Sequence, residues 1–208
     1  MEAFIHGFVL AFGLILPLGV QNVFVFNQGA SQPSFIRAVP VIITASICDT
    51  LLILLAVIGV SVVVLNIAWL KTILFGVGFL FLVYMGWATW KATSDEKNEG
   101  RREAISPKKQ IIFALSVSLL NPHAIIDTIG VIGTSSLYYS SKEKWIFAGA
   151  AVLVSWIWFF SLALCGRALG KLDNGGKWIN YLNKVSAFII WGTAIYIGIL
   201  LYRQLVGN

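Results

Sequence analysis

Six long apolar runs restrict the fold of this chain more than any other feature of its sequence. They cover about residues 3–26, 38–66, 69–90, 110–137, 145–165 and 185–202. A helix that rises 1.5 Å per residue needs about 20 apolar residues to cross about 30 Å of hydrocarbon. Transmembrane β-strands are shorter and alternate in hydrophobicity, whereas these runs are continuous. The runs therefore predict an all-α membrane protein with six transmembrane helices.

Charged residues are too few to cover the surface of a soluble domain. They make up 12% of the chain, and 58% of the chain is hydrophobic, whereas about 25% charged residues is usual for a globular domain. The net charge of +6 would point to nucleic acid in a soluble protein, but here the charges gather between the apolar runs, as the positive-inside rule predicts. We therefore expect the lipid bilayer, and no nucleic acid, as a partner.

Lysine and arginine are distributed unevenly between the two sets of connecting segments. The connectors after the first, third and fifth runs contain eleven of them, and the opposite side contains four. The richer side is expected to be cytoplasmic, so both termini lie outside if all six runs cross. The first run is interrupted, and the alternative is a re-entrant first segment that keeps the N-terminus inside.

The sequence divides into two similar halves within a single transmembrane domain over residues 1–208. Residues 1–90 form one half-repeat, 91–109 a charged cytoplasmic connector, and 110–208 the second half-repeat. Pro17 and Pro122 are 105 positions apart, and so are Asn22 and Asp127. Because three helices per half is an odd number, the halves would have opposite orientations. We expect a 3+3 inverted repeat with helices 1 and 4 broken, an arrangement that places transporter sites at the breaks.

Two acids stand alone near the middle of apolar runs, Asp49 in the second and Asp127 in the fourth. An acid at this depth costs roughly 2.5–3.5 kcal/mol on insertion scales. No lysine or arginine lies within either of these two runs to neutralise them. The favoured interpretation is a pair of carboxylates that face a polar cavity and bind a cation or a proton. The alternative is a structural role, in which neighbours such as Asn22 or His123 satisfy them.

Both predicted breaks place a proline beside glycine or asparagine, with Pro17 and Gly19 in the first and Pro122 in the second. Proline removes a backbone donor and clashes with the carbonyl four residues earlier. The half-helix that follows a break exposes free N–H groups that attract a carboxylate. Acids for positive groups and a helix terminus for a carboxylate together predict a site for a cationic amino acid.

The remaining candidate residues are polar side chains beside the breaks. Gln21, Asn22 and Asn121 can hydrogen-bond either end of such a substrate, and His123 could relay protons. Cys48 and Cys165 stand singly, without a CxxC motif or a histidine at metal-ligand spacing, and we expect neither a metal site nor a cofactor.

Several of these stretches resemble the LysE family of amino-acid exporters. They are GVQNV at 19–23 with NQG at 27–29, ICDTLLI at 47–53, LLNPHA at 119–124 with Asp127-Thr128, WIFAGA at 145–150 and SWIWF at 155–159. The family usually has proline directly after the first-helix glycine, where this chain has Val20. The Gln-Asn and Asn-Pro-His-x-x-x-Asp forms are similar to the branch that exports L-lysine and L-arginine.

This resemblance implies a secondary active exporter, not an enzyme, in the bacterial plasma (inner) membrane. It implies efflux of L-lysine, L-arginine or both in exchange for protons. Neutral amino acids and another small cation or metal ion are the alternative substrates. The residues leave lysine against arginine, the proton ratio and the oligomeric state open, and Gly76 and Gly192 could pack helices within one protomer or in a homodimer.

An intramembrane aspartyl protease is the main alternative outside transport, since two membrane acids can form a catalytic dyad. Such proteases are expected to have Gly-x-Gly before one acid, but Asp127 follows Ala-Ile-Ile and Asp49 follows Ser-Ile-Cys. The sequence therefore favours transport.

Overall fold

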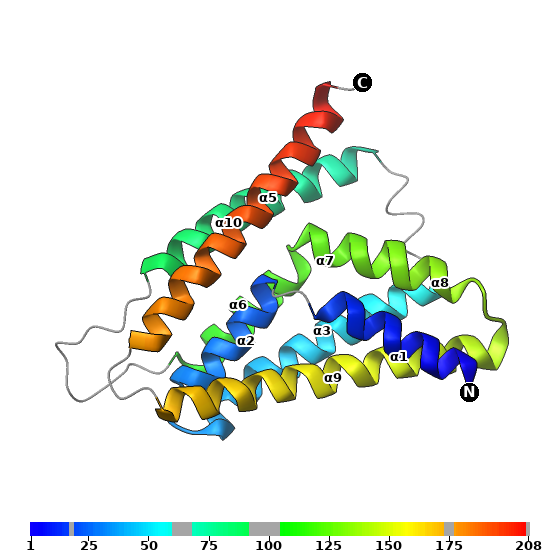
Figure 1. The fold of residues 1–208 in the computed structure, drawn as a ribbon. Helices are drawn as coiled ribbons and strands as arrows, with labels where there is room; N and C mark the ends of the chain where they lie inside the picture. The colour runs from blue at the N-terminus through cyan, green and yellow to red at the C-terminus, as the bar shows by residue number, and fades with distance from the viewer. Residues whose placement is uncertain (17–18, 60–67, 92–104, 173–176, 207–208) are drawn as a thin grey trace.

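The computed structural model describes residues 1–16, 19–59, 68–91, 105–172 and 177–206, and these parts contain helices but no strand (Figure 1). The elements are α1 (Glu2–Ile15), α2 (Val20–Ser31), the short 3₁₀-helix η1 (Phe35–Ala38), α3 (Val39–Ile58), α5 (Ala68–Lys91), α6 (Pro107–Leu119), α7 (Pro122–Asp127), the π-helix η2 (Thr128–Gly133), α8 (Thr134–Ser136), α9 (Ser141–Leu172) and α10 (Lys177–Val206). The predicted all-helical class is confirmed for these residues.

Three of the described helical segments are each long and apolar enough to cross a membrane. They are Phe35–Ile58, Lys142–Leu172 and Asn183–Arg203. Helices α1 and α2 qualify together as a fourth, broken span, bent by 78° between them. A multi-pass membrane protein is therefore established, whereas the predicted count of six goes beyond these three or four spans.

The first and fourth predicted segments are interrupted close to their prolines. Helix α1 ends at Ile15, and α2 begins after Gly19, whose backbone is extended with φ −77° and ψ 173°. Pro17 lies outside the described residues. Helix α6 ends at Leu119, and α7 begins at Pro122, where proline is tolerated because the first N–H of a helix has no intrahelical partner.

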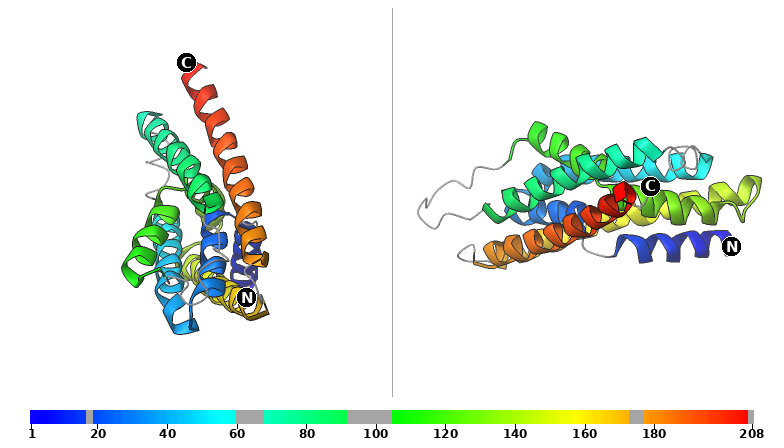
Figure 2. Two further views of the ribbon diagram at one scale, coloured as in Figure 1. Left: turned by 90° about the vertical axis from the view of Figure 1, so that its left-hand side faces the viewer. Right: turned by 90° about the horizontal axis from the view of Figure 1, so that it is seen from above.

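Helix α9 is the central element of the larger group of helices. It packs against α1, α2 and α3, and Figure 1 shows it running alongside them. Helices α5 and α10 form a second unit, packed along each other and inclined to the first group (Figures 1 and 2). Contacts from α10 to α2 and from α5 to α7 join the two units next to the helix breaks.

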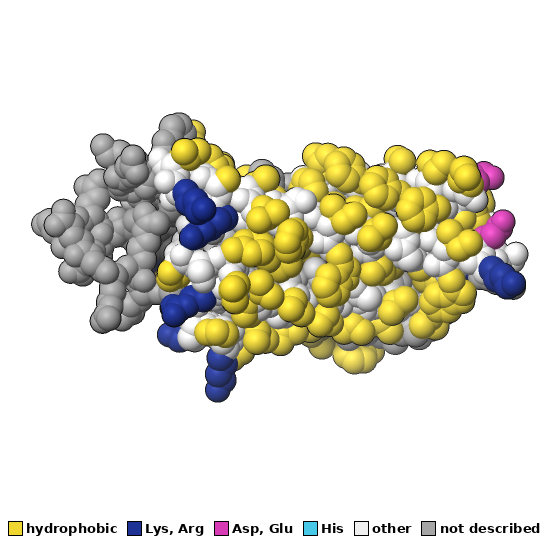
Figure 3. Space-filling view, turned by 90° about the horizontal axis from the view of Figure 1, so that it is seen from below, with side chains coloured by type: hydrophobic (Ala, Val, Ile, Leu, Met, Phe, Trp, Pro, Cys, Tyr) yellow, Lys and Arg dark blue, Asp and Glu magenta, His cyan; other side chains and the backbone are white. Residues whose placement is uncertain are grey.

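Charged side chains gather at the two ends of the molecule, and an apolar surface separates them (Figure 3). The end formed by η1 with the start of α3, the end of α5, the start of α6, the end of α9 and the start of α10 is rich in lysine and arginine. The described basic residues of these segments are Arg37, Lys91, Lys108, Lys109, Arg167, Lys171 and Lys184. Between the ends, large side chains such as Ile47, Leu51 and Ile157 are exposed, as expected for surfaces that face lipid.

Candidate functional site

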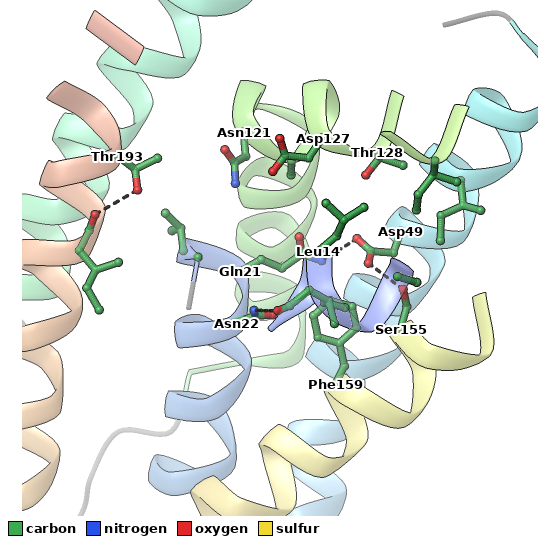
Figure 4. A pocket seen from close by; sticks show the side chains of 18 residues that line it. Leu14, Gln21, Asn22, Asp49, Asn121, Asp127, Thr128, Ser155, Phe159 and Thr193 are labelled. Carbon is green, nitrogen blue, oxygen red and sulfur yellow. Dashed lines mark hydrogen bonds between the residues drawn. The ribbon is translucent and has the colours of Figure 1, made fainter. Parts of the chain in front are cut away.

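A cavity of about 410 Å³ lies where the two helix breaks meet α3, α9 and α10 (Figure 4). Its walls come from the end of α1, the start of α2, the middle of α3, α7 with η2, and the middle of α9 and α10. The lining residues are Ala11, Leu14, Ile15, Gly19, Val20, Gln21, Asn22, Asp49, Ile53, Asn121, Ala124, Asp127, Thr128, Ile132, Ser155, Phe159, Ile189 and Thr193. The structure thus brings both predicted acids and both predicted breaks to one cavity.

Asp49 is held in the cavity wall by side chains from two other helices. It is the eleventh of the twenty residues of α3, which places it near the middle of a span. Its Oδ1 accepts a hydrogen bond from Gln21 Nε2 of α2 at 3.4 Å, and its Oδ2 accepts one from Ser155 Oγ of α9 at 2.9 Å. Both donors are neutral, so these contacts leave the negative charge of an ionised Asp49 uncompensated.

Asp127 reaches the same cavity from a different wall (Figure 4). It is the last residue of α7, directly before the π-helix η2. A π-helical turn inside a helix is uncommon and often marks a functional position. The side chain is half-buried. The cavity is therefore lined by a second acid besides Asp49.

The N-terminus of α2 opens into the cavity beside these acids. Gly19, Val20, Gln21 and Asn22 all line it, and the first intrahelical bond of α2 runs from Val23 N to Gly19 O at 3.0 Å. The N–H groups before Val23 therefore have no acceptor within the helix. Together with the helix dipole they make this wall attractive to an anion such as a carboxylate.

The two asparagines at the breaks have different surroundings. Asn22 donates from Nδ2 to the carbonyl oxygen of Ile15 at 2.7 Å, which satisfies a terminal carbonyl of α1 across the first break. Asn121 is the N-cap residue of α7, yet its side chain makes no capping hydrogen bond. It is only 6% exposed, and its buried Oδ1 has no hydrogen-bond partner among the described residues.

The predicted site residues divide into those that the structure places and those that it does not. Asp49, Asp127, Gln21, Asn22, Asn121 and Gly19 all line the cavity. Pro122 and His123 belong to α7 by their backbone, but their side chains lie outside the described part of the chain, as does all of Pro17.

Other lining residues were not among the predicted site residues, including three on α9 and α10. Ser155 and Phe159 are one helical turn apart on α9, and Thr193 lies on α10. A single hydroxyl in an apolar helix is common, because it can bond to the backbone of its own helix. The signal that marks Ser155 is its contact with Asp49, which depends on how α3 and α9 face each other.

The cavity combines acids that can attract a cation with a wall that can attract an anion. Its described lining includes two acids and no lysine or arginine, while the start of α2 favours a negative group. Nowhere in the described residues do three or more His, Cys, Asp or Glu side chains gather as a metal site would require. Apolar side chains such as Leu14, Ile53 and Phe159 supply the rest of the wall.

Similarity to known proteins extends over almost the whole chain. The family model described as LysE type translocator matches residues 12–201 of the chain. The chain is 56% identical over 202 residues to the putative amino-acid transporter YisU of Bacillus subtilis (strain 168), an alignment that covers 97% of this chain and 91% of that protein.

More distant similarity extends to proteins named as arginine exporters. The arginine exporter protein ArgO of Klebsiella pneumoniae (strain 342) is 29% identical over 208 residues, covering 99% of this chain and 95% of that protein. The arginine exporter protein ArgO of Escherichia coli (strain K12) is 29% identical over 195 residues, covering 92% and 91%. No solved structure matches the chain.

Proposed function

The chain belongs to the LysE family of translocators, and from this premise we propose that it exports the basic amino acids L-arginine or L-lysine in exchange for protons. Members of this family are transporters and not enzymes, and arginine export is the activity named for the more distant relatives. The observation that carries the proposal is the cavity that combines Asp49 and Asp127 with the N-terminus of α2.

Each part of a basic amino acid has a complementary group in this cavity. The α-carboxylate fits the start of α2, where the first N–H groups have no acceptor within the helix and the helix dipole favours negative charge. The α-ammonium and the side-chain cation fit Asp49 and Asp127. The volume of about 410 Å³ lies in the usual range of roughly 300–1,000 Å³ for small-molecule sites.

Proton exchange follows from the charge of this substrate. Moving one positive charge out of a cell against an inside-negative potential costs about 2.3 kcal/mol per 100 mV. Exchange for one proton is electroneutral, and exchange for two protons also draws on the potential. Asp49 and Asp127 are the groups that can bind a proton when the substrate leaves, and the amide of Asn121 is a further substrate contact.

The contacts between helices support the proposed inverted repeat and the count of six spans. The broken segment of the first half, α1 with α2, packs against α9 of the second half. The broken segment of the second half, α6 with η2, packs against α3 of the first half. The pairs α3 with α9 and α5 with α10 also join equivalent helices. A two-fold relation between halves of opposite orientation accounts for all of these pairings.

We place the end of the molecule that is rich in lysine and arginine in the cytoplasm. The start of α3, the end of α5 and the end of α9 share this end, and basic residues are retained on the cytoplasmic side of a membrane. The bacterial relatives make the plasma membrane the expected location.

A homodimer is compatible with the surface of the described protomer. A Cβ atom added to Gly76 or Gly192 would meet no atom within 4 Å. Neither glycine therefore serves close packing between described helices, and both could do so between protomers. Light scattering of the purified protein in detergent measures the oligomeric state directly.

Purified protein in liposomes tests the proposed function. Vesicles loaded with labelled arginine or lysine are diluted into medium with a clamped potential and a chosen pH difference. Efflux should depend on the pH difference and should acidify the interior as protons enter. Threonine, leucine and a divalent metal ion are the comparison substrates.

The outcomes separate the alternatives. Efflux of arginine or lysine that ignores both pH difference and voltage would refute proton exchange. Transport of threonine and leucine without arginine or lysine would refute the basic-amino-acid assignment. In cells fed with dipeptides that contain lysine or arginine, loss of this protein should raise the intracellular level of its substrate.

A further inference from the structure

Ser155 is a buried hydroxyl that contacts an acid of the cavity. It lies in the middle of α9 and is 3% exposed. Its Oγ donates to Asp49 Oδ2 at 2.9 Å, and Figure 4 shows the two side chains facing each other across the contact between α3 and α9. Such a hydrogen bond to a charged group is stronger than one between neutral groups.

The two partners of Asp49 differ in what they can do when its protonation changes. Gln21 Nε2 is an amide donor at 3.4 Å, and the same atom lies 3.5 Å from the carbonyl oxygen of Ala45. An amide nitrogen can only donate, whereas a hydroxyl can donate to a carboxylate and accept from a carboxylic acid. Ser155 can therefore stay bonded to Asp49 whichever carboxyl oxygen takes the proton, whereas Gln21 Nε2 can stay bonded only while Oδ1 carries no proton.

Building on the proposed function, we propose that Ser155 is a positioning residue that orients Asp49 and sets how protons and cationic substrate compete for it. The hydroxyl fixes the carboxylate from α9, while Gln21 fixes it from the start of α2. A cation that binds Asp49 meets an oriented carboxylate. A proton that replaces the cation leaves the acid bonded to the same hydroxyl.

Other ionisable groups around Asp49 are few. Helix α2 and the π-helix η2 contain none. The ionisable neighbours of Asp49 are Cys48, the preceding residue of α3, and Asp127, which lines the same cavity from α7. The charged residues of the other elements packed on α3 lie near the ends of those elements; they are Arg37, Lys108, Lys109, Lys142, Glu143, Lys144, Arg167 and Lys171. Ser155 and Gln21 are thus the direct hydrogen-bond partners described for this acid.

Loss of the hydroxyl should change the pH dependence of transport in a definite direction. Without its donor the ionised form of Asp49 is less stabilised, so a proton competes better with the substrate. When the pH falls far enough to protonate Asp49, the half-saturating arginine concentration rises. In the variant without the hydroxyl, this rise should begin at a higher pH. One hydrogen bond to a charged group corresponds to a shift of about one pH unit, or about tenfold in proton affinity.

The experiment compares three Ser155 variants with a matched serine on the same helix. Ser155→Ala removes the hydroxyl, Ser155→Cys keeps the shape with a weaker donor, and Ser155→Thr keeps the hydroxyl. Ser161→Ala is the control, because Ser161 is exposed and is not part of the cavity lining. For each protein the half-saturating arginine concentration is measured in liposomes across acidic to alkaline pH.

The expected result is an upward shift in Ser155→Ala, a smaller shift in Ser155→Cys, and wild-type profiles in Ser155→Thr and Ser161→Ala. An unchanged pH profile in Ser155→Ala or in Ser155→Cys would overturn the proposal. If Ser155→Ala does not fold, as judged by its amount in the membrane and its melting temperature, the cysteine variant decides. Absence of arginine and lysine transport in the wild type would instead contradict the proposed function.

Discussion

Gln21 Nε2 lies 3.4 Å from Oδ1 of Asp49, so the second residue of α2 contacts the acid in the middle of α3. Gln21 stands directly after the first helix break, and its neighbour Asn22 is bonded back to Ile15 at the end of α1. The break and the acid are therefore linked by side chains. A movement of α2 at the break would change the surroundings of Asp49.

The two acids are expected to be indispensable for export. Asp49→Asn and Asp127→Asn remove the negative charge that attracts a cation but keep a side chain of the same shape. Both variants should lose arginine and lysine export while their amount in the membrane stays near that of the wild type. Flux from loaded liposomes and immunodetection in membranes are the two measurements.

Glu143→Gln is the matched control for these acids. It also removes one carboxylate, but Glu143 is exposed in the first turn of α9 and does not line the cavity. Its export should equal that of the wild type. Retained transport by Asp127→Asn would remove Asp127 from the mechanism, and the same result for Asp49→Asn would also remove the ground for a role of Ser155.

Asn121 offers a test in which stability and transport change in opposite directions. Its Oδ1 is buried without a hydrogen-bond partner among the described residues, and such a group costs about 1–3 kcal/mol. Asn121→Ala removes that cost, so the melting temperature should stay constant or rise. If the amide contacts substrate, the half-saturating arginine concentration should nevertheless rise about tenfold, as expected for loss of one hydrogen bond of roughly 1.4 kcal/mol.

Asn22→Ala is the control, because the same substitution there removes a 2.7 Å hydrogen bond to Ile15. This variant should melt at a lower temperature than the wild type. A lower melting temperature for Asn121→Ala, together with unchanged arginine binding, would show that Asn121 supports the fold and not the substrate.

The acids and the breaks could be predicted from the sequence because each violates a rule of apolar helices. An ionisable residue in the middle of a span is expensive, and proline interrupts the hydrogen bonds of a helix. Asp49, Asp127 and the starts of α2 and α7 follow from these two rules and line one cavity in the structure. The rules need only the position of a residue along its own segment.

The partners of these residues could not be predicted, because they depend on how helices face one another. Ser155 is one of several serines in apolar helices, and only the rotation of α9 against α3 brings it to Asp49. Helix ends were also imprecise. Helix α3 ends at Ile58 because Gly59 has φ 90°, although the apolar composition continues to about residue 66.

Close packing between α2 and α9 is expected to depend on glycine. A Cβ atom on Gly166 would overlap the carbonyl oxygen of Phe26, and one on Gly170 would overlap that of Ala30. Because these obstacles are backbone atoms, Gly166→Ala forces the helices apart, and overpacking of this kind costs about 1–3 kcal/mol. The melting temperature in detergent and the transport rate should both fall.

Gly149→Ala on the same helix is the matched control, since a Cβ atom there would meet nothing within 4 Å. It should leave the melting temperature and the transport rate unchanged. Equal stability of Gly166→Ala and Gly149→Ala would contradict the close contact between α2 and α9.

Arg167 is expected to stabilise the far end of α2 through the shape of its side chain as well as its charge. Its Nη1 donates to the carbonyl oxygen of Gln32 at 2.6 Å, and its Nη2 donates to that of Pro33 at 2.8 Å. The planar guanidinium reaches both oxygens at once, which a lysine ammonium on a flexible chain does less well. Arg167→Lys should therefore lower the melting temperature although the charge is kept. The loss should correspond to about 1.5–3 kcal/mol, the usual contribution of a hydrogen bond to a charged group.

Lys171→Gln is the control. It removes a charge from an exposed position one turn later and should not lower the melting temperature. If Arg167→Lys melts like the wild type, positive charge alone is sufficient at this end of α9 and the paired hydrogen bonds do not hold α2 in place.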